Sequence, residues 1–512
     1  MSPYDRVPYP SVPVAQSHPD RLATIASLSG LRPAAPESCR VLEIGCAAGG
    51  NLIPMAAGLP GSQFVGIDAS AVQLEEAERL VAELGLSNVE LVHRDLGADG
   101  ALAGDPFDYV VCQGVFSWVS PDAQEAILRL SAQRLAPQGV AYLNTNVFPG
   151  WKMRIALRDL LRHHTGSFER PEERIAEARA LLDSLDETLG HDAFANHLRQ
   201  ELTGVRGVGD AYLFHEYLEG ENRPLYFHEL IDRTRAAGLD YLGEANFTDT
   251  SGSLFPERIR AGLTRASEDF VRLEQRADFT SGRSYRSSLF CLAGAGGAGR
   301  ADLGACYAAC RIGPRTVDRS LDSTIPEPFE FSTDVVRRAT VSDPLVKAAV
   351  VALGERWPRS LSLSDLLPEA LARLERKPDG GAARLEAGLL DLFARGAVRL
   401  SPRAVELATE VSPRPLAFAP ARALASRWGL VPNLLHQVVA LDPFEQVLVA
   451  ALDGERDPAQ LVSRLVAATE EGLLKVSVEG APVSDPAGLE AAYAEALPER
   501  LRSLRERALL RS

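Results

Sequence analysis

The segment VLEIGCAAGGN at residues 41–51 decides the fold of this chain. A run of strand-forming apolar residues ends at Gly45 in a turn of glycines and alanines, and a helical stretch follows over residues 50–58. Small residues let the backbone of such a turn approach a ligand closely. The segment therefore predicts a buried β-strand, a ligand-binding turn and a helix.

The chain repeats this alternation of strand and helix as far as residue 146. We expect strands at 39–45, 63–68, 89–95, 107–114 and 139–146, and helices at 50–58, 71–85 and 121–137. Alternation at this spacing is typical of an α/β domain with a mostly parallel, doubly wound sheet. We place this domain at residues 1–165.

Two further domains are expected after the sheet. Residues 166–300 are predicted to be mainly helical and to end at the Gly/Ala-rich break AGAGGAGR, residues 293–300. Residues 301–512 form the third domain. Two helices across 441–466 and a β-ribbon at 473–483 predict that it is winged-helix-like.

Composition excludes several classes of protein. The 512 residues are 46% hydrophobic and 24% charged, as in globular proteins. No apolar run approaches the roughly 20 residues of a membrane helix, and residues 1–20 do not resemble a secretory signal. The six cysteines form no C-x-x-C motif, which predicts reduced, buried thiols in a cytoplasmic protein. Cys306 and Cys310 are expected on one helix face.

The net charge of −15 is unevenly distributed along the chain. Residues 1–330 carry −14 and residues 331–512 carry −1. An acidic front half repels a phosphate backbone, so nucleic acid is not an expected partner. It suits a basic or neutral partner instead.

Carboxylates follow the first strands and indicate the ligand. Asp68 ends the second strand, where a carboxylate can accept both ribose hydroxyls of an adenosine, and Asp95 ends the third, beside the adenine. NAD and S-adenosylmethionine are the two candidates. A dinucleotide turn needs G-x-G-x-x-G, but Ala47 replaces its middle glycine, and Glu43 would repel a pyrophosphate. S-adenosylmethionine has no phosphate and is cationic at its amine and sulfonium, so this pattern favours it over NAD.

Longer segments carry a family resemblance. They are residues 4–31, VLEIGCAAGGNLIPMA (41–56), FVGIDAS (64–70), FDYVVCQGVFSWVS (107–120), NVFPGW (146–151), YLFHEYLEGENRPLYFHEL (212–230), YRSSLFCL (285–292) and, more weakly, 433–454. With these segments the chain resembles bacterial class I methyltransferases that carry a methyltransferase regulatory domain. The family includes the rickettsial protein-lysine methyltransferases of outer-membrane proteins. The resemblance implies a Rossmann-like methyltransferase domain with an N-terminal lid.

The resemblance also implies which residues bind the cofactor. The turn would be Glu43, Gly45, Cys46, Ala47 and Gly49. Asp68 would hold the ribose, and Asp95 with Leu96 the adenine. Gln113, Gly114 and Val115 would lie under the methionine part, and Tyr4, Tyr9 and His18 would form the lid. Asn51 and Ala69 complete the cofactor-binding candidates.

Aromatic residues lie at or after the ends of strands four and five, where such sites are built. Phe116, Trp118, Phe148 and Trp151 suit a cationic methyl donor and a methylated ammonium group. Asn146 could orient an amine, so Asn146, Trp118 and Trp151 are the catalytic candidates. The alternative is that both tryptophans are core residues under a lid.

A polar helical segment adds substrate-binding candidates. His215 and Glu216 are expected on a substrate-facing or inter-domain face, with a solvated helix as the alternative. His215 and Glu219 have the spacing of metal ligands, but without a third ligand we expect no metal site.

Three functions remain open. The first is N-methylation of lysine in a protein or peptide, possibly a basic one. The second is methylation of a small molecule or natural product, because Asn144-Thr145-Asn146 departs from the Ser-Tyr-Asn-like run of the family. The third is a regulatory binding module whose winged-helix-like end contacts DNA.

Overall fold

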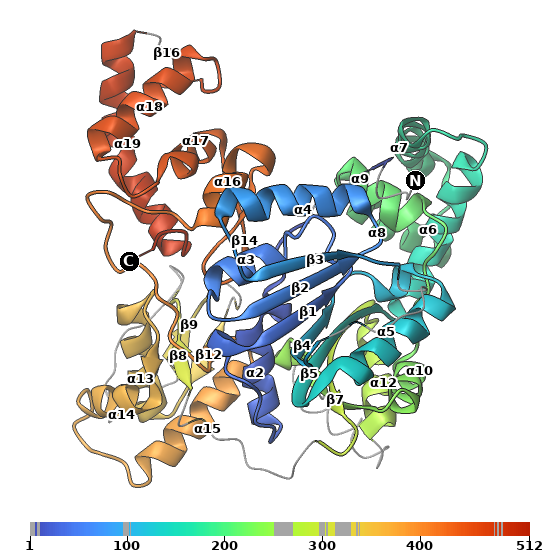
Figure 1. The fold of residues 1–512 in the computed structure, drawn as a ribbon, viewed down its shortest axis with the longest axis horizontal. Helices are drawn as coiled ribbons and strands as arrows, with labels where there is room; N and C mark the ends of the chain where they lie inside the picture. Colours follow the sequence, from blue (N-terminus) through green and yellow to red (C-terminus); the bar gives the residue numbers. More distant parts are fainter. Residues whose placement is uncertain are drawn as a thin grey trace.

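A computed structural model describes residues 6–7, 11–95, 102, 104–249, 270–295, 303, 306–312, 329–333, 336, 338–475, 477–478, 481–482 and 485–511. A seven-stranded sheet with the order β3-β2-β1-β4-β5-β7-β6 lies at its centre (Figure 1). The strands are β1 (Arg40–Ile44), β2 (Gln63–Asp68), β3 (Val89–His93), β4 (Phe107–Cys112), β5 (Leu135–Asn146), β6 (Leu239–Glu244) and β7 (Tyr285–Leu292). Strands β1 to β5 are parallel, which confirms the predicted sheet.

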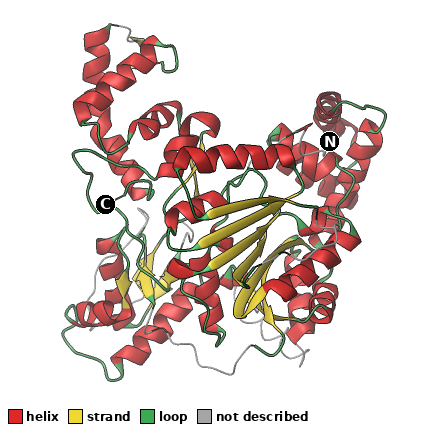
Figure 2. Cartoon of the chain, viewed as in Figure 1, coloured by secondary structure: helices red, strands yellow, loops and turns green. Residues whose placement is uncertain are grey.

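Helices cover both faces of the sheet (Figure 2). They are α2 (Pro19–Leu28), α3 (Leu52–Gly58) and α4 (Ala71–Leu84) on one face, and α5 (Pro121–Arg134) and α10 (Phe227–Ala236) on the other. Successive residues of a strand point to opposite faces. Val41 accordingly packs in the core with α2 and α3, and Leu42 in the core with α5 and α10.

Local signals set the ends of these helices. The Ser70 hydroxyl accepts a hydrogen bond from the Gln73 N–H at the start of α4, and Gly85 ends that helix at a φ of 63°. Ser120 caps α5 in the same way, with Pro121 in the first turn.

The middle part of the chain begins as a helical bundle, as expected. It contains α6 (Gly150–Thr165), α7 (Pro171–Thr188), α8 (Ala193–Arg206), α9 (Asp210–Leu213) and the π-helical turn η4 (Phe214–Leu218), packed around a leucine-rich core. Strands β6 and β7, with α12 (Phe270–Ser281) between them, were not expected. They join the sheet antiparallel, β7 against β5 and β6 against β7. Local patterning missed them because these pairings are long-range.

The next unit packs against α2. Its elements are β8 (Tyr307–Ala309), β9 (Phe329–Phe331), β10 (Ala339–Val341), α13 (Pro344–Arg356), β11 (Leu361–Ser362), α14 (Leu363–Leu371), α15 (Gly381–Ala394) and β12 (Arg399–Ser401). Cys306 and Cys310 flank β8, so the expectation of a shared helix face is wrong. Their segment is extended because β8 pairs with β11 and β12. All six cysteines are buried.

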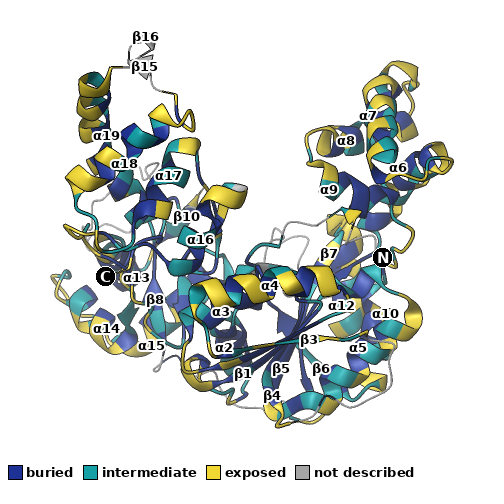
Figure 3. Ribbon diagram, turned by 45° about the horizontal axis from the view of Figure 1, so that its top comes forward, coloured by how far each residue is buried: buried dark blue, intermediate teal, exposed yellow. Residues whose placement is uncertain are grey.

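The last unit comprises α16 (Ala419–Trp428), β13 (Leu430–Pro432), β14 (Val438–Ala440), α17 (Pro443–Ala451), α18 (Pro458–Glu470), β15 (Ser477–Val478), β16 (Ala481–Pro482) and α19 (Pro486–Glu506). Its core is continuous with Ile53 of α3 and with Ala77 and Leu80 of α4. Figure 3 shows α6–α9 and α16–α19 standing on opposite sides of α4. Among the described helices, none is long and apolar enough to cross a membrane. The predicted break at 293–300 falls outside the described residues from 296 onward.

Candidate functional site

The turn after β1 has an unusual backbone. Gly45, Ala47 and Gly49 have φ values of 74°, 50° and 75°, in the region that favours glycine. The N–H groups of Gly45 and Cys46 donate to the Ile67 carbonyl at 2.8 and 3.2 Å. A Cβ on Gly45 would lie 2.3 Å from Cγ2 of Val115. The turn is thus pinned to β2 on one side and touches the residue after β4 on the other.

Asp68 joins the first two turns at this edge of the sheet. Its Oδ2 accepts from the Ala47 N–H and its Oδ1 from the Ser70 N–H, both at 2.8 Å. The neighbouring Ala69 is exposed, and so is Asp95, which follows β3. The contacts of Asp68 and Asp95 with a nucleoside stay predictions. Leu96 lies outside the described residues.

Glu43 is a buried carboxyl group next to the turn. It is 2% exposed, and its Oε1 accepts from Asn51 Nδ2 at 2.8 Å. Its Oε2 is buried without a hydrogen-bond partner among the described residues. Burial, and more weakly the Asp68 charge, raise the pKa of Glu43 to about 8 against the effect of Asn51. A buried acidic oxygen without a partner fits a cationic group such as an amino acid ammonium.

The N-terminal segment covers the turn from the other side. Ser11 Oγ accepts from the Gly50 N–H and Asn51 Oδ1 from the Val14 N–H, both at 2.8 Å. The predicted lid residues Tyr4 and Tyr9 lie outside the described residues. The third, His18, caps α2, because its Nδ1 accepts from the Asp20 N–H at 3.1 Å.

The surroundings of His18 are those of a neutral residue. Its ring centroid lies 5.1 Å from that of His436 in the last unit. Burial, followed by the nearby charges of Arg403 and Arg399, lowers the pKa of His18 to about 3. His18 thus contacts the C-terminal part of the chain.

The end of β4 is fixed through the neighbouring strands. Gln113 Oε1 accepts from the Tyr142 hydroxyl at 2.5 Å, and this hydroxyl lies 3.1 Å from Ser287 Oγ of β7. Gly114 follows with a φ of 68°. The predicted methionine-side residues therefore border the same turn as Gly45, which touches Val115.

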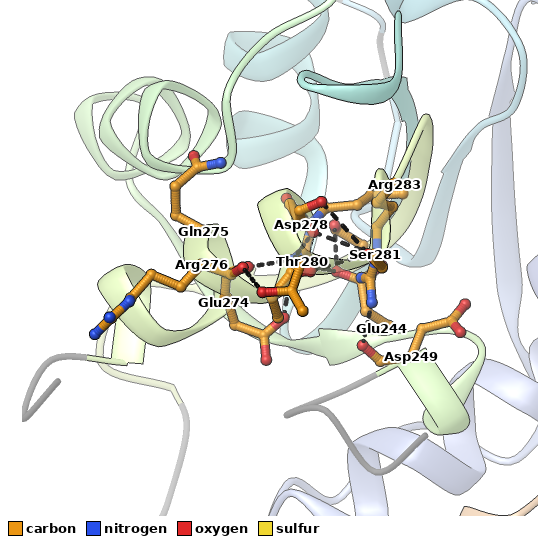
Figure 4. Close-up of polar contacts among 12 residues, drawn as sticks. Glu244, Asp249, Glu274, Gln275, Arg276, Asp278, Thr280, Ser281 and Arg283 are labelled. Carbon is orange, nitrogen blue, oxygen red and sulfur yellow. Dashed lines mark hydrogen bonds and ion pairs between the residues drawn. The ribbon is translucent and has the colours of Figure 1, made fainter. Parts of the chain in front are cut away.

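A buried ion cluster supports Ser287. Arg286 is 1% exposed and donates to Glu244 at 2.6 Å, Glu274 at 2.9 Å and Asp278 at 2.7 Å. Figure 4 shows that Glu244, Glu274, Asp278 and Arg283 converge between β6, α12 and the loop before β7. Sequence analysis did not identify this cluster, since its members are scattered over residues 244–286. The Glu244 Oε2 atom also accepts from the Ser287 N–H at 3.1 Å.

Two of the predicted catalytic residues form one aromatic pair. The rings of Trp118 and Trp151 are 5.8 Å apart and nearly perpendicular, at 78°. Trp118 is half-buried and Trp151 is buried. Asn146, the third, ends β5, and its N–H donates to Ser117 Oγ at 2.8 Å. Its buried Nδ2 meets no hydrogen-bond acceptor in the described part of the chain. The structure thus links the FSW turn η3 (Phe116–Trp118) to the end of β5.

The other aromatic candidates, Phe116 and Phe148, have different packing partners. Phe116 is fully buried in the core between α5 and the sheet. Phe148 packs against Tyr226 at 5.1 Å, and the Lys152 ammonium lies 4.4 Å from the centre of the Phe148 ring. A contact of either phenylalanine with substrate remains a prediction.

His215 and Glu216 lie on the π-helical turn η4. His215 Nε2 is 2.6 Å from the Val7 carbonyl oxygen of the N-terminal segment. Burial raises the pKa of Glu216 to about 7, although Arg154 and Arg158 lower it. Arg158 donates to the Glu216 carbonyl oxygen at 2.9 Å, and its guanidinium lies 5.9 Å from the centre of the Trp118 ring. Glu216 is therefore close to the aromatic pair. Within the described ranges, no three His, Cys, Asp or Glu residues are grouped as metal ligands would be.

Comparisons with known proteins identify the family of this chain. Three family models match: a methyltransferase domain at 41–139, a "Predicted methyltransferase regulatory domain" at 209–292 and a "PKMT, C-terminal winged helix domain" at 413–509. The uncharacterised protein RP789 of Rickettsia prowazekii is 31% identical over 496 residues, covering 94% of this chain and 89% of the relative. The chain belongs to the class I methyltransferases with a methyltransferase regulatory domain.

A solved structure supports the whole architecture of this methyltransferase. PKMT2 from Rickettsia typhi, in complex with AdoHcy, matches with a TM-score of 0.85 and 26% identity. The match covers 98% of this chain and 100% of PKMT2. The predicted winged-helix end is thereby confirmed, as is the α/β methyltransferase fold.

Sequence reasoning missed several residues around the turn of the methyltransferase. Ser11, Val14 and Ser17 contact the turn where aromatic lid residues were expected. His436 reaches it from almost 400 residues away, and no local motif marked that position.

Proposed function

We propose that this S-adenosylmethionine-dependent methyltransferase methylates lysine side chains of a protein or peptide. The observation that carries the cofactor assignment is the buried Glu43 carboxyl oxygen without a partner in the described residues. It lies beside a turn with positive φ values at Gly45, Ala47 and Gly49, where a Cβ on Gly45 or Gly49 would collide with neighbouring side chains. AdoHcy in PKMT2 is the demethylated form of the same cofactor.

Each part of the cofactor has a proposed partner. Glu43 would hold the ammonium group, Asp68 the ribose and Asp95 the adenine edge. Gln113, Gly114 and Val115 would border the methionine chain. When bound, the cofactor supplies a methyl group already activated on a sulfonium.

The protein must then deliver a neutral, oriented amine. A lysine has a reference pKa near 10.4, so its deprotonation at pH 7 costs about 4–5 kcal/mol. Desolvation lowers that cost, and alignment of the nucleophile can supply roughly 7–11 kcal/mol of the barrier. Trp118 and Trp151 would exclude water, and the Asn146 amide would orient the amine. A strong general base is not required.

The shape and charge of the chain support a polypeptide acceptor. The likeness to PKMT2 extends over all three units, and the front half carries −14 charges, which suits a basic peptide. The six cysteines are buried and form no C-x-x-C motif, which supports a cytoplasmic location.

The test uses the purified protein with methyl-labelled S-adenosylmethionine and a bacterial lysate. We expect label in polypeptides, and mass spectrometry should place it on lysine. Peptides with lysine replaced by arginine serve as the control and should not be labelled. Label confined to small molecules would contradict the proposed acceptor while leaving the cofactor assignment intact.

One observation favours a small-molecule acceptor as the second candidate. Where the family has a Ser-Tyr pair, Asn144 donates to the Arg286 carbonyl and to Ser287 Oγ, both at 3.2 Å, and Thr145 is buried. The site therefore has no phenol at this position. Labelling of low-molecular-weight metabolites in the same lysate would support this candidate.

A further inference from the structure

A hairpin of the winged-helix unit reaches the cofactor-binding turn. Strands β13 and β14 pair antiparallel, and residues 433–437 connect them. His436 lies in this connection and is 3% exposed. Its Nε2 is 2.8 Å from Asn51 Oδ1, and Asn51 Nδ2 is 2.8 Å from Glu43 Oε1. The contacts form a continuous line from the C-terminal unit to Glu43, the carboxyl group that we propose holds the cofactor ammonium.

The hairpin turn holds His436 in a defined place. Its φ is 56°, in the left-handed region that residues other than glycine adopt uncommonly, although histidine, asparagine and aspartate do so more often than the rest. Asn433 stabilises the turn, because its Oδ1 accepts from the N–H groups of Leu435 and Gln437, both at 2.9 Å. Asn433 Nδ2 also donates to the Arg507 carbonyl at 2.9 Å, which ties the turn to the end of α19. Backbone strain of this kind often accompanies a functional role.

The direction of the hydrogen bonds follows from Val14. The Val14 N–H can only donate, and it donates to Asn51 Oδ1 at 2.8 Å. This fixes the Asn51 amide with its oxygen toward Val14 and His436 and its nitrogen toward Glu43. His436 must then donate from Nε2. Every contact in the line is therefore a complementary pair of donor and acceptor.

The two units also share a hydrophobic core behind the turn. Ile53 follows Asn51 in α3 and is fully buried, in one cluster with residues of α16, α17 and α19. On the surface of the same junction, Arg427 of α16 pairs with Glu83 of α4 at 2.6 Å. The junction is continuous, and among its described contacts the one from His436 reaches Asn51.

We propose that His436 is a positioning residue that orients Asn51 and Glu43 for the cofactor, so that cofactor affinity depends on the docked winged-helix unit. The proposal rests on the proposed cofactor. The ligand it concerns is the amino acid ammonium of S-adenosylmethionine or S-adenosylhomocysteine. The winged-helix unit thereby contributes to the cofactor site of the methyltransferase domain.

The test compares two substitutions at His436 in the full-length protein. His436→Phe keeps a ring but removes the donor, while His436→Gln places an amide N–H near the position of Nε2. Calorimetry should show that H436F weakens S-adenosylhomocysteine binding by roughly 3- to 10-fold, the effect of one hydrogen bond. H436Q should restore most of the affinity.

Arg427→Ala is the matched control, since it breaks the ion pair between the same two units without touching Asn51. We expect R427A to bind the ligand as the wild type does. Equal weakening by R427A and H436F would overturn the proposal, because any loosening of the junction would then suffice. Unchanged binding by H436F would overturn it too.

A double-mutant cycle excludes a purely structural effect. In the Asn51→Ala background the line is already broken, so H436F should cause no further loss of affinity. A full additional loss there would contradict the proposal. If the wild type itself bound no S-adenosylhomocysteine, the proposed cofactor would fail, and with it this inference. Binding by the wild type with no difference among the variants would refute the inference alone.

The coupling must be reciprocal. If docking of the hairpin strengthens ligand binding, ligand binding must strengthen docking by the same factor. Amide hydrogen exchange in residues 430–440 should therefore slow when S-adenosylhomocysteine is added to the wild type. It should slow less in H436F. Equal slowing in H436F and the wild type would argue against coupling through His436 and Asn51.

Discussion

Gly45 and Val115 approach each other so closely that a Cβ on the glycine would lie 2.3 Å from Cγ2 of the valine. The contact joins the turn after β1 to the turn after β4, and these turns carry the proposed partners of the ammonium group and the methionine chain. Gly45 also has a φ of 74°. Two independent constraints thus exclude a side chain at this position.

The first prediction concerns this contact. Gly45→Ala should cost about 1–3 kcal/mol of backbone strain and displace the turn. Calorimetry should then show binding of S-adenosylhomocysteine weakened by about tenfold or more. Gly58→Ala is the control at the end of the following helix. A Cβ there meets no atom within 4 Å in the described part of the chain. Similar affinities for the two variants would contradict the packing described.

The second prediction concerns proton release by Glu43. Its pKa of about 8 means that the carboxyl group is mostly protonated in the free protein at pH 7. A cationic ligand favours the ionised form, so binding should release a proton, and affinity should rise from about pH 6 to pH 8. Calorimetry at pH 7 in buffers of different ionisation enthalpy measures the release. Glu43→Gln should abolish both effects, and an exposed carboxyl on β3 provides the control variant, Glu90→Gln.

The same group makes a prediction about stability without ligand. The folded-state pKa of Glu43 is raised above the value of 4.5 in the unfolded chain, so the folded protein binds the proton more tightly. Its contribution is therefore complete below about pH 4.5 and is lost as the pH rises through 8. Denaturant midpoints should fall less over this range in E43Q than in the wild type. If the denaturant midpoint fell with pH equally in E43Q and the wild type, groups other than Glu43 would be responsible.

The fourth prediction separates substrate recognition from cofactor binding. Trp118→Leu removes one ring of the aromatic pair but leaves the buried Trp151 in place. We expect kcat/KM for a lysine peptide to fall between about 2- and 30-fold, the range of a cation–π contact. The Kd for S-adenosylhomocysteine should not change. Phe194→Ala, which removes a ring that is 60% exposed on α8, should change neither quantity.

How much of this structure can be predicted from the sequence depends on how far apart along the chain the interacting residues are. The strand-turn-helix at 41–58 and the capped helix α4 follow from local signals, namely apolar runs, glycines and the Ser70 cap. Glu43 and Asp68 could be assigned because the ends of parallel strands meet at one edge of a sheet. His436 could not, because its contact with Asn51 depends on how two units pack. The same holds for β6 and β7, whose pairing brings Arg286 to three distant carboxylates.

The last prediction concerns the charge balance of that cluster. Glu244, Glu274 and Asp278 are each 1% exposed or less, and Arg286 is the cation that contacts all three. Burial raises the pKa of Asp278 to about 6 even beside the guanidinium, which shows how costly these charges are. Arg286→Met keeps much of the volume but leaves the carboxylates without their shared partner. Removal of one partner from a buried ion pair costs about 3–5 kcal/mol.

Denaturant unfolding should therefore show a much lower midpoint for R286M than for the wild type. Unfolding measured at lower pH should partly restore the R286M midpoint, because protonation neutralises the carboxylates. Arg79→Met is the matched control, since Arg79 pairs with Glu75 on the exposed face of α4 at 3.4 Å. Exposed pairs contribute about 0–1 kcal/mol, so its midpoint should barely move. Equal midpoints for R286M and R79M would mean that the cluster is not ionised in the folded protein. R286M should also disturb the proposed cofactor site, because Ser287 and Tyr142 connect the ion cluster to Gln113.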